Sequence, residues 1–162
     1  MRYRHVQRVR ELFGKGLGLL EEALGILGAA YGSEISRQAA VARFLYCSYV
    51  TAEHVMAWTM AKRTLLLETE TGVPEGADAV CDALGLEDRT PAGLARRMKE
   101  IAAAERDNVR LALTAWEEDS RIGFEATMEY VFNKECAEWK LAETERTLAL
   151  LDDYLARHGI RL

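Results

Sequence analysis

The stretch AAVARFLYCSYVTAEHVMAWTM, residues 39–60, decides the fold of this chain. It is apolar at almost every position, and its only side chains expected to carry a charge are Arg43 and Glu53, with His54 beside the latter. A helix that is apolar on every face must be covered by partners on more than one side. The sequence therefore predicts a central helix from about Ile35 to Leu67, enclosed by neighbouring helices.

Three further segments carry the periodicity of long helices. Between Val6 and Tyr31 apolar residues recur at alternating steps of three and four, which places them in one wide stripe. Similar stripes run over residues 91–120 and 134–158. Four long helices joined by short or surface connections pack as antiparallel neighbours. The chain is therefore predicted to be all-α, a single-domain antiparallel four-helix bundle spanning residues 1–162.

Capping signals mark where these helices begin and end. Thr90 followed by Pro91 is a start signal for the third long helix, and Asn133 is the expected N-cap of the fourth. The connection between the second and third long helices, residues 68–90, is long, and a short helix ending at Gly85 is expected inside it. Ser33 is the expected N-cap of the second helix.

The first helical segment contains an unusual number of glycines. Each glycine costs about 1 kcal/mol relative to alanine in an exposed helix interior. Two interpretations stay open: a local break near residues 14–18, or the close approach of a neighbouring backbone. The residues concerned are Gly14, Gly16, Gly18, Gly25 and Gly28.

Composition and charge exclude several classes of function. The net charge is −5, and the basic residues cluster only at Arg96, Arg97 and Lys99, which argues against nucleic-acid binding. Lys15 and the acidic pair at 21–22 interrupt the first apolar stretch, so neither a signal peptide nor a membrane span is predicted.

Cysteine and histidine usage argues against a metal or catalytic centre. Cys47, Cys81 and Cys136 are odd in number and far apart, which fits buried side chains or a reducing compartment and favours the cytoplasm. A carboxylate-bridged di-metal bundle needs Glu-x-x-His pairs, and the sequence contains none. His5 and His158 lie near the termini. No catalytic set, metal site or cofactor is therefore expected.

Two polar constellations remain as candidate sites. On the second helix four residues step by three, four and four and so share a face, and on the third helix two polar residues lie one turn apart. The two groups either lie on solvated edges or meet as a hydrogen-bonded polar layer that fixes helix register. These residues are Thr51, His54, Trp58 and Lys62 on the second helix, and Glu105 and Asn108 on the third.

The second constellation is the connection DSRIGFEATMEY, residues 119–130. It places Asp119, Arg121, Glu125 and Glu129 among aromatic rings at one end of the bundle, and such connections often carry recognition groups. Carboxylates and arginine beside rings suit a hydroxyl-rich ligand. The alternative is an Asp–Arg pair at the helix end, with the rings closing the core.

The order and spacing of four pieces resembles the C-terminal helical region of large bacterial glycoside-hydrolase-like proteins. The pieces are YVTAEHVMAWTMAKRTLL (49–66), IAAAERDNVRLAL (101–113), DSRIGFEATMEY (119–130) and ECAEWKLAE (135–143). The resemblance covers residues 15–155, and Asp119 to Glu125 is its most specific part. The chain departs from it at Val50, where arginine is expected, and at Ala126–Thr127, where a small residue followed by serine is expected.

The resemblance implies a function in support of catalysis performed elsewhere. Proteins of this kind, similar to α-glucuronidases and β-hexosaminidases, carry a (β/α) barrel ahead of such a region. The chain would then be a C-terminal fragment or detached accessory module that braces the barrel, with residues 119–130 reaching the rim of its sugar site. Its partners would be the barrel and carbohydrate.

A different class of function stays open on the residues alone. The apolar second helix and the glycine-rich first helix could together expose an apolar surface. The chain would then be a free-standing helical interaction module, either a homodimer or an adaptor.

Overall fold

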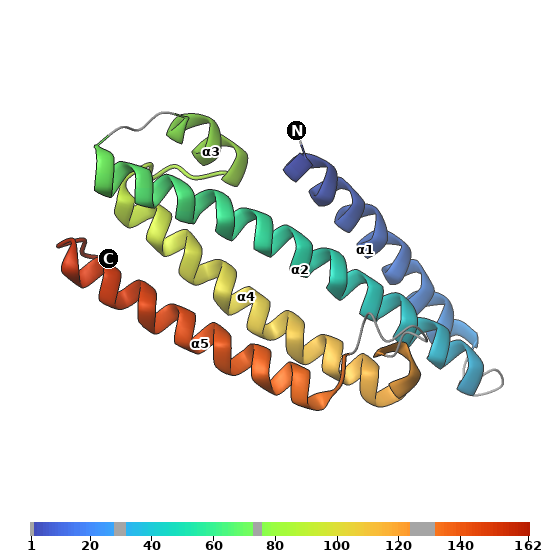
Figure 1. Ribbon diagram of the computed structural model, residues 1–162. Helices are drawn as coiled ribbons and strands as arrows, with labels where there is room; N and C mark the ends of the chain where they lie inside the picture. Colours follow the sequence, from blue (N-terminus) through green and yellow to red (C-terminus); the bar gives the residue numbers. More distant parts are fainter. Residues whose placement is uncertain (1, 28–31, 73–75, 124–131) are drawn as a thin grey trace.

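The computed structural model is all-helical over the residues that it describes, which are 2–27, 32–72, 76–123 and 132–162. This confirms the predicted all-α class. Within those ranges there are five α-helices and one 3-10 turn (Figure 1). They are α1 (Arg2–Leu27), α2 (Gly32–Thr71), α3 (Ala77–Leu84), α4 (Pro91–Glu118), η2 (Ser120–Gly123) and α5 (Lys134–Arg157).

The four long helices lie side by side in the order α1, α2, α4, α5 (Figure 1). Each runs in the opposite direction to its neighbour, and α3 sits against the C-terminal part of α2. The 40 residues of α2 make a helix about 60 Å long, which packs against α1 on one side and α4 on the other. The prediction of a central second helix is therefore confirmed.

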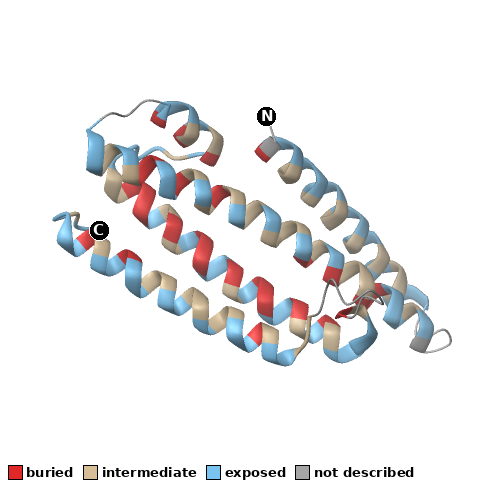
Figure 2. Ribbon diagram, viewed as in Figure 1, coloured by how far each residue is buried: buried red, intermediate tan, exposed pale blue. Residues whose placement is uncertain are grey.

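The core is made mainly by α2 and α4, and Figure 2 shows buried residues following α4 along its length. Small side chains such as Ala57 and Ala61 on α2 and Ala95 on α4 are fully buried and allow the two helices to pack closely. A larger apolar cluster adds Cys81 from α3 and Leu151 from α5. A smaller cluster at the other end forms around Phe44, whose ring meets Phe132 edge to face.

Local capping chemistry agrees with most predicted boundaries. The Thr90 hydroxyl accepts from the Gly93 backbone N–H at 3.2 Å, and the Asn133 side chain accepts from Cys136 N–H at 2.8 Å. Gly85 ends α3 with φ at +67°. The predicted N-cap at Ser33 is wrong, because α2 begins one residue earlier, at Gly32.

The glycines of α1 do not behave as either interpretation expected. The helix is continuous from Arg2 to Leu27, so the predicted break near residues 14–18 is wrong. A Cβ at Gly16, Gly18 or Gly25 would meet nothing within 4 Å, and one at Gly14 would meet the Tyr46 ring at 3.1 Å and no backbone. Packing of α1 on α2 outweighs the low helix propensity of glycine. Gly28 lies outside the described residues.

Alanine should therefore be tolerated in α1 and rejected at the start of α4. We expect Gly18→Ala to raise the free energy of unfolding by about 1 kcal/mol, because it removes only the propensity cost of glycine. Gly93→Ala should lower it, because the new Cβ would lie 2.1 Å from the Asp88 carbonyl oxygen. Urea unfolding followed by circular dichroism, at low protein concentration, measures both. Equal effects of the two substitutions would contradict this packing.

Candidate functional site

The carboxylate of Glu105, on α4, joins three helices. From α2, the Thr51 hydroxyl donates to Oε1 at 2.7 Å, and His54 Nδ1 lies 2.6 Å from Oε2. From α5, the Lys140 ammonium donates to Oε1. The Glu105 side chain is only 11% exposed, so these donors replace water around a buried charge. Because an ionised carboxylate can only accept, His54 Nδ1 carries the proton of this bond.

Asn108 extends the arrangement by one turn of α4. Its Nδ2 donates to the Cys47 carbonyl oxygen at 2.9 Å and to the Thr51 hydroxyl at 3.0 Å. Lys140 Nζ also donates to Thr51, at 3.2 Å. The Thr51 hydroxyl thus accepts from two side chains while it donates to Glu105. We call the five residues Thr51, His54, Glu105, Asn108 and Lys140 the Glu105 cluster.

Helical spacing explains why these side chains meet. Thr51 and His54 lie three residues apart on one face of α2, and Glu105 and Asn108 do the same on α4. The two helices are antiparallel neighbours, so the two faces oppose each other. Lys140 reaches the buried carboxylate from α5 along its long aliphatic stem.

The cluster holds Glu105 in its ionised form. Burial raises the pKa of this carboxyl, but the hydrogen bonds from His54, Lys140 and Thr51 outweigh burial and lower the pKa to about 2. The Cys47 thiol shows the opposite effect. Burial, assisted by the negative charge of Glu105, raises its pKa to about 11, so at neutral pH it is a protonated and poorly nucleophilic thiol.

A cleft of about 270 Å³ opens between α2 and α5 beside this cluster, with α4 as its floor. His54, Glu105 and Lys140 line it together with two tryptophans, Trp58 from α2 and Trp139 from α5. The Trp139 side chain is prominent on the surface, where the residue is 68% exposed. The remaining polar residues of the lining are a second carboxylate, Glu143, and three threonines, Thr59, Thr144 and Thr147.

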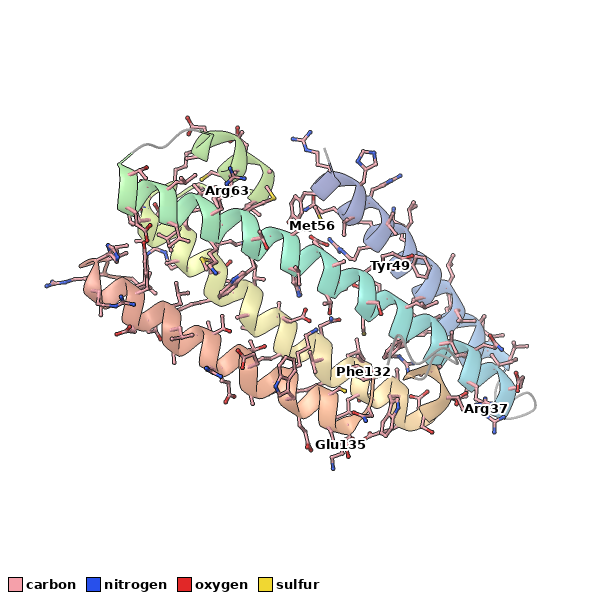
Figure 3. The ribbon with its side chains drawn as sticks, in the orientation of Figure 1. Arg37, Tyr49, Met56, Arg63, Phe132 and Glu135 are labelled. Carbon is pink, nitrogen blue, oxygen red and sulfur yellow. The ribbon has the colours of Figure 1, made fainter. Side chains whose placement is uncertain are left out.

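Two further hollows continue this cleft along α5. One, of about 430 Å³, shares Trp139 and Lys140 with the cleft and extends toward Phe132, which Figure 3 labels beside the start of α5. The other, of about 320 Å³, shares Trp58 and extends toward Tyr154. Lys62 lines this second hollow, so it lies apart from the Glu105 cluster.

The corner after α4 is closed by an ion pair. Arg121 Nε and Nη2 donate to the two carboxylate oxygens of Asp119 at 2.8 and 2.6 Å, and the Arg121 backbone N–H adds a bond of 3.2 Å. These bonds hold the pKa of Asp119 at about 2. Asp119 and Arg121 therefore face each other. Glu125 and Glu129, from the same predicted site, lie outside the described residues.

The structure brings together four of the six residues considered as a polar layer: Thr51, His54, Glu105 and Asn108. Trp58 lines the adjacent cleft. Lys140 was missed as a member, although its position could have revealed it. It lies three residues after the buried Ala137 and four before Thr144, so a lysine interrupts the inward stripe of α5.

Comparison of this chain with protein-family models, with curated proteins and with solved structures found no match. In the part of the chain that the structure describes, no group of three or more His, Cys, Asp and Glu side chains is placed to hold a metal ion. None of the helices described is both long and apolar enough to cross a membrane.

Removing the charge at the centre of the cluster should destabilise the fold in a pH-dependent way. Glu105→Gln leaves Lys140 and His54 without their shared anion. We expect it to lower the free energy of unfolding by about 2 kcal/mol at pH 7, less than for a fully buried ion pair because Lys140 is partly solvated. The folded-state pKa of Glu105 lies below its ordinary value of 4.5, so its contribution is complete above that pH. The difference between the two proteins should shrink as the pH falls from about 4.5 to about 2.

Urea unfolding across this pH range measures the effect. Glu117→Gln is the matched control, since Glu117 is an exposed residue of the same helix. Two results would contradict the cluster as described: Glu105→Gln lowers the free energy of unfolding no more than Glu117→Gln does, or its effect is the same at pH 7 and at pH 2.5.

Proposed function

We propose that this chain is a non-catalytic helical accessory domain of a glycoside-hydrolase-like, carbohydrate-active protein. It braces a catalytic barrel and contributes the cleft between α2 and α5 to the rim of the sugar site. One observation carries this proposal: two tryptophans from different helices line a cleft together with a carboxylate, an ammonium group and an imidazole. The sequence resemblance to helical regions of such proteins supports it independently.

The lining of the cleft matches the chemistry of a sugar ring. Aromatic rings such as those of Trp58 and Trp139 pack against the apolar C–H faces of a pyranose, while polar groups fix its hydroxyls. The hydroxyls of Thr59 and Thr144 already donate to backbone carbonyls one turn earlier, and their lone pairs can accept from a ligand. At about 270 Å³ the cleft is slightly smaller than the ~300–1,000 Å³ typical of drug-sized ligands, and it suits a single ring.

The ionisation of the acids supports a binding role in preference to a catalytic one. Glycoside hydrolysis needs a carboxylic acid whose pKa is raised so that it can protonate the leaving group. The pKa values of Glu105 and Asp119 are instead lowered to about 2, and both carboxylates are occupied by donors from the chain itself. At neutral pH each can accept hydrogen bonds but cannot act as the general acid.

Within this proposal the four long helices correspond to the antiparallel four-helix bundle predicted from the sequence. The contacts of α1 with α2, α2 with α4, and α4 with α5 support it, as do the alternating helix directions (Figure 1). The cleft lies in the groove that α2 and α5 form over α4. This groove offers a surface on which a barrel can rest.

Binding of sugars to the isolated chain tests the proposal. We expect weak, saturable binding of glucuronic acid or N-acetylglucosamine, or of short oligosaccharides that contain them. NMR shift changes should centre on the indole N–H groups of Trp58 and Trp139. Loss of one stacking ring in Trp139→Ala should weaken binding by about tenfold. Leu111→Ala is the control, because this exposed α4 side chain lines neither the cleft nor either of the hollows that continue it.

Two results would contradict the proposal. The absence of saturable binding to any of these sugars would remove the carbohydrate role. Robust glycosidase turnover by the isolated chain would remove the accessory role, because the chemistry would then reside here.

A second candidate function is a free-standing helical interaction module. The observation that favours it is a row of exposed large apolar side chains on α1, on the side of this helix that does not contact α2.

A further inference from the structure

A second apolar stripe runs along α1, apart from the one that packs on α2. Its members follow one another at steps of three, four, three, four and three. We call these six residues the outer seam: Val9, Leu12, Gly16, Leu19, Ala23 and Ile26. Four of them are large and increasingly exposed along the helix, at 36% for Val9, 52% for Leu12, 68% for Leu19 and 79% for Ile26.

The outer seam is not used to hold α1 in place. The helix docks through its other face, where the Phe13 ring lies 4.7 Å from the ring of Tyr49. Arg10 and Gln7 add hydrogen bonds to Glu53 of α2, at 2.8 and 3.4 Å. The large apolar side chains of the seam are therefore exposed to solvent, away from the contacts that hold α1 on α2.

The exposed glycines of α1 also indicate a partner outside this chain. Gly16, Gly18 and Gly25 each lower helix stability relative to alanine, yet a Cβ at any of them would meet nothing within 4 Å. Among the residues that the structure describes, nothing requires glycine at these positions. A second helix that approached α1 closely along the seam would require a small residue at Gly16.

Alternating steps of three and four are the spacing by which two helices interlock side chains. For a second copy of α1, two directions are possible. A parallel pair places Leu12 against Leu12, Leu19 against Leu19 and Gly16 against Gly16. An antiparallel pair centred near residues 17 and 18 places Leu19 against the second copy's Gly16, and Leu12 against the second copy's Ala23. Only the antiparallel pair matches each leucine with a small residue.

Charge favours the same direction. Lys15 and Glu22 flank the outer seam on one side, seven residues apart, and within the described residues neither forms an ion pair. In the antiparallel pair, Lys15 lies within one turn of the second copy's Glu22, and the symmetry creates this contact twice. A parallel pair would instead put these flanks on opposite edges of the interface, so that Lys15 and Glu22 could not pair.

We infer that α1 is the interface of a homodimer, in which the outer seams of two copies pack antiparallel about a two-fold axis near residues 17 and 18. This inference rests on the second candidate function and gives it a surface, a partner and a direction. The interface is isologous, so the same residues contribute from both chains. Leu19 is its central anchor and fills the space above the second copy's Gly16.

Sedimentation equilibrium of the full chain tests the seam. We expect a reversible dimer, and Leu19→Glu should weaken it on the order of a hundredfold, since each dimer loses two buried leucines. Leu150→Glu is the matched control, because Leu150 is similarly exposed at 60% but lies on α5. Circular dichroism should show the same helix content in both variants.

A second variant tests the direction. Gly16→Leu should weaken the dimer by overfilling the space that Leu19 of the other chain occupies, although leucine is the better helix former. In a parallel pair the same change would strengthen the dimer. Gly25→Leu, at an exposed glycine of α1 that lies off the seam, should leave dimerisation unchanged.

The outcomes separate the two levels of the proposal. A wild-type chain that stays monomeric up to about 1 mM would overturn the homodimer. Its Kd would then be weaker than about 1 mM, which corresponds to a binding free energy of only about −4 kcal/mol. A dimer unaffected by Leu19→Glu would leave the interaction module standing and overturn the seam as its interface. A dimer strengthened by Gly16→Leu would overturn the antiparallel direction.

Discussion

The negative charge of Glu105 is taken out of water at the meeting point of three helices, and the rest of the structure has to supply its solvation. An isolated buried carboxylate would cost several kcal/mol. Here Thr51 and His54 from α2 and Lys140 from α5 each donate a hydrogen bond to it. Their geometry depends on the register of α4 against both partners. A slip of either neighbouring helix by one turn would deprive the charge of the donors from that helix.

The same constraint shapes the cleft. Lys140 must point inward to reach Glu105, and this directs the adjacent Trp139 away from the core, where it is 68% exposed. The opening between α2 and α5 thus lies beside the ion pair that fixes α5. The polar cluster that joins the three helices therefore also forms part of the cleft lining.

Much of the fold could be predicted from local signals, because those signals act over a few residues. The apolar stretch at 39–60 identified the central helix, and Thr90 and Asn133 marked helix starts that the structure shows. The glycines of α1 wrongly predicted a break near residues 14–18, because the low helix propensity of glycine is weaker than packing against α2. Spacing grouped Thr51 with His54 and Glu105 with Asn108, but could not show which faces meet. The role of Lys140 and the presence of the cleft were not predicted, because both depend on how α5 lies against α4.

The ionisation state of Glu105 is the most direct measure of this account. A carbon-13 NMR titration of the folded protein can follow the Glu105 side-chain carboxyl by itself. We expect it to titrate with a pKa of about 2, because the donors from α2 and α5 outweigh its burial. A pKa at or above the ordinary 4.5 would show that the three helices do not meet at this carboxylate, and would contradict the account.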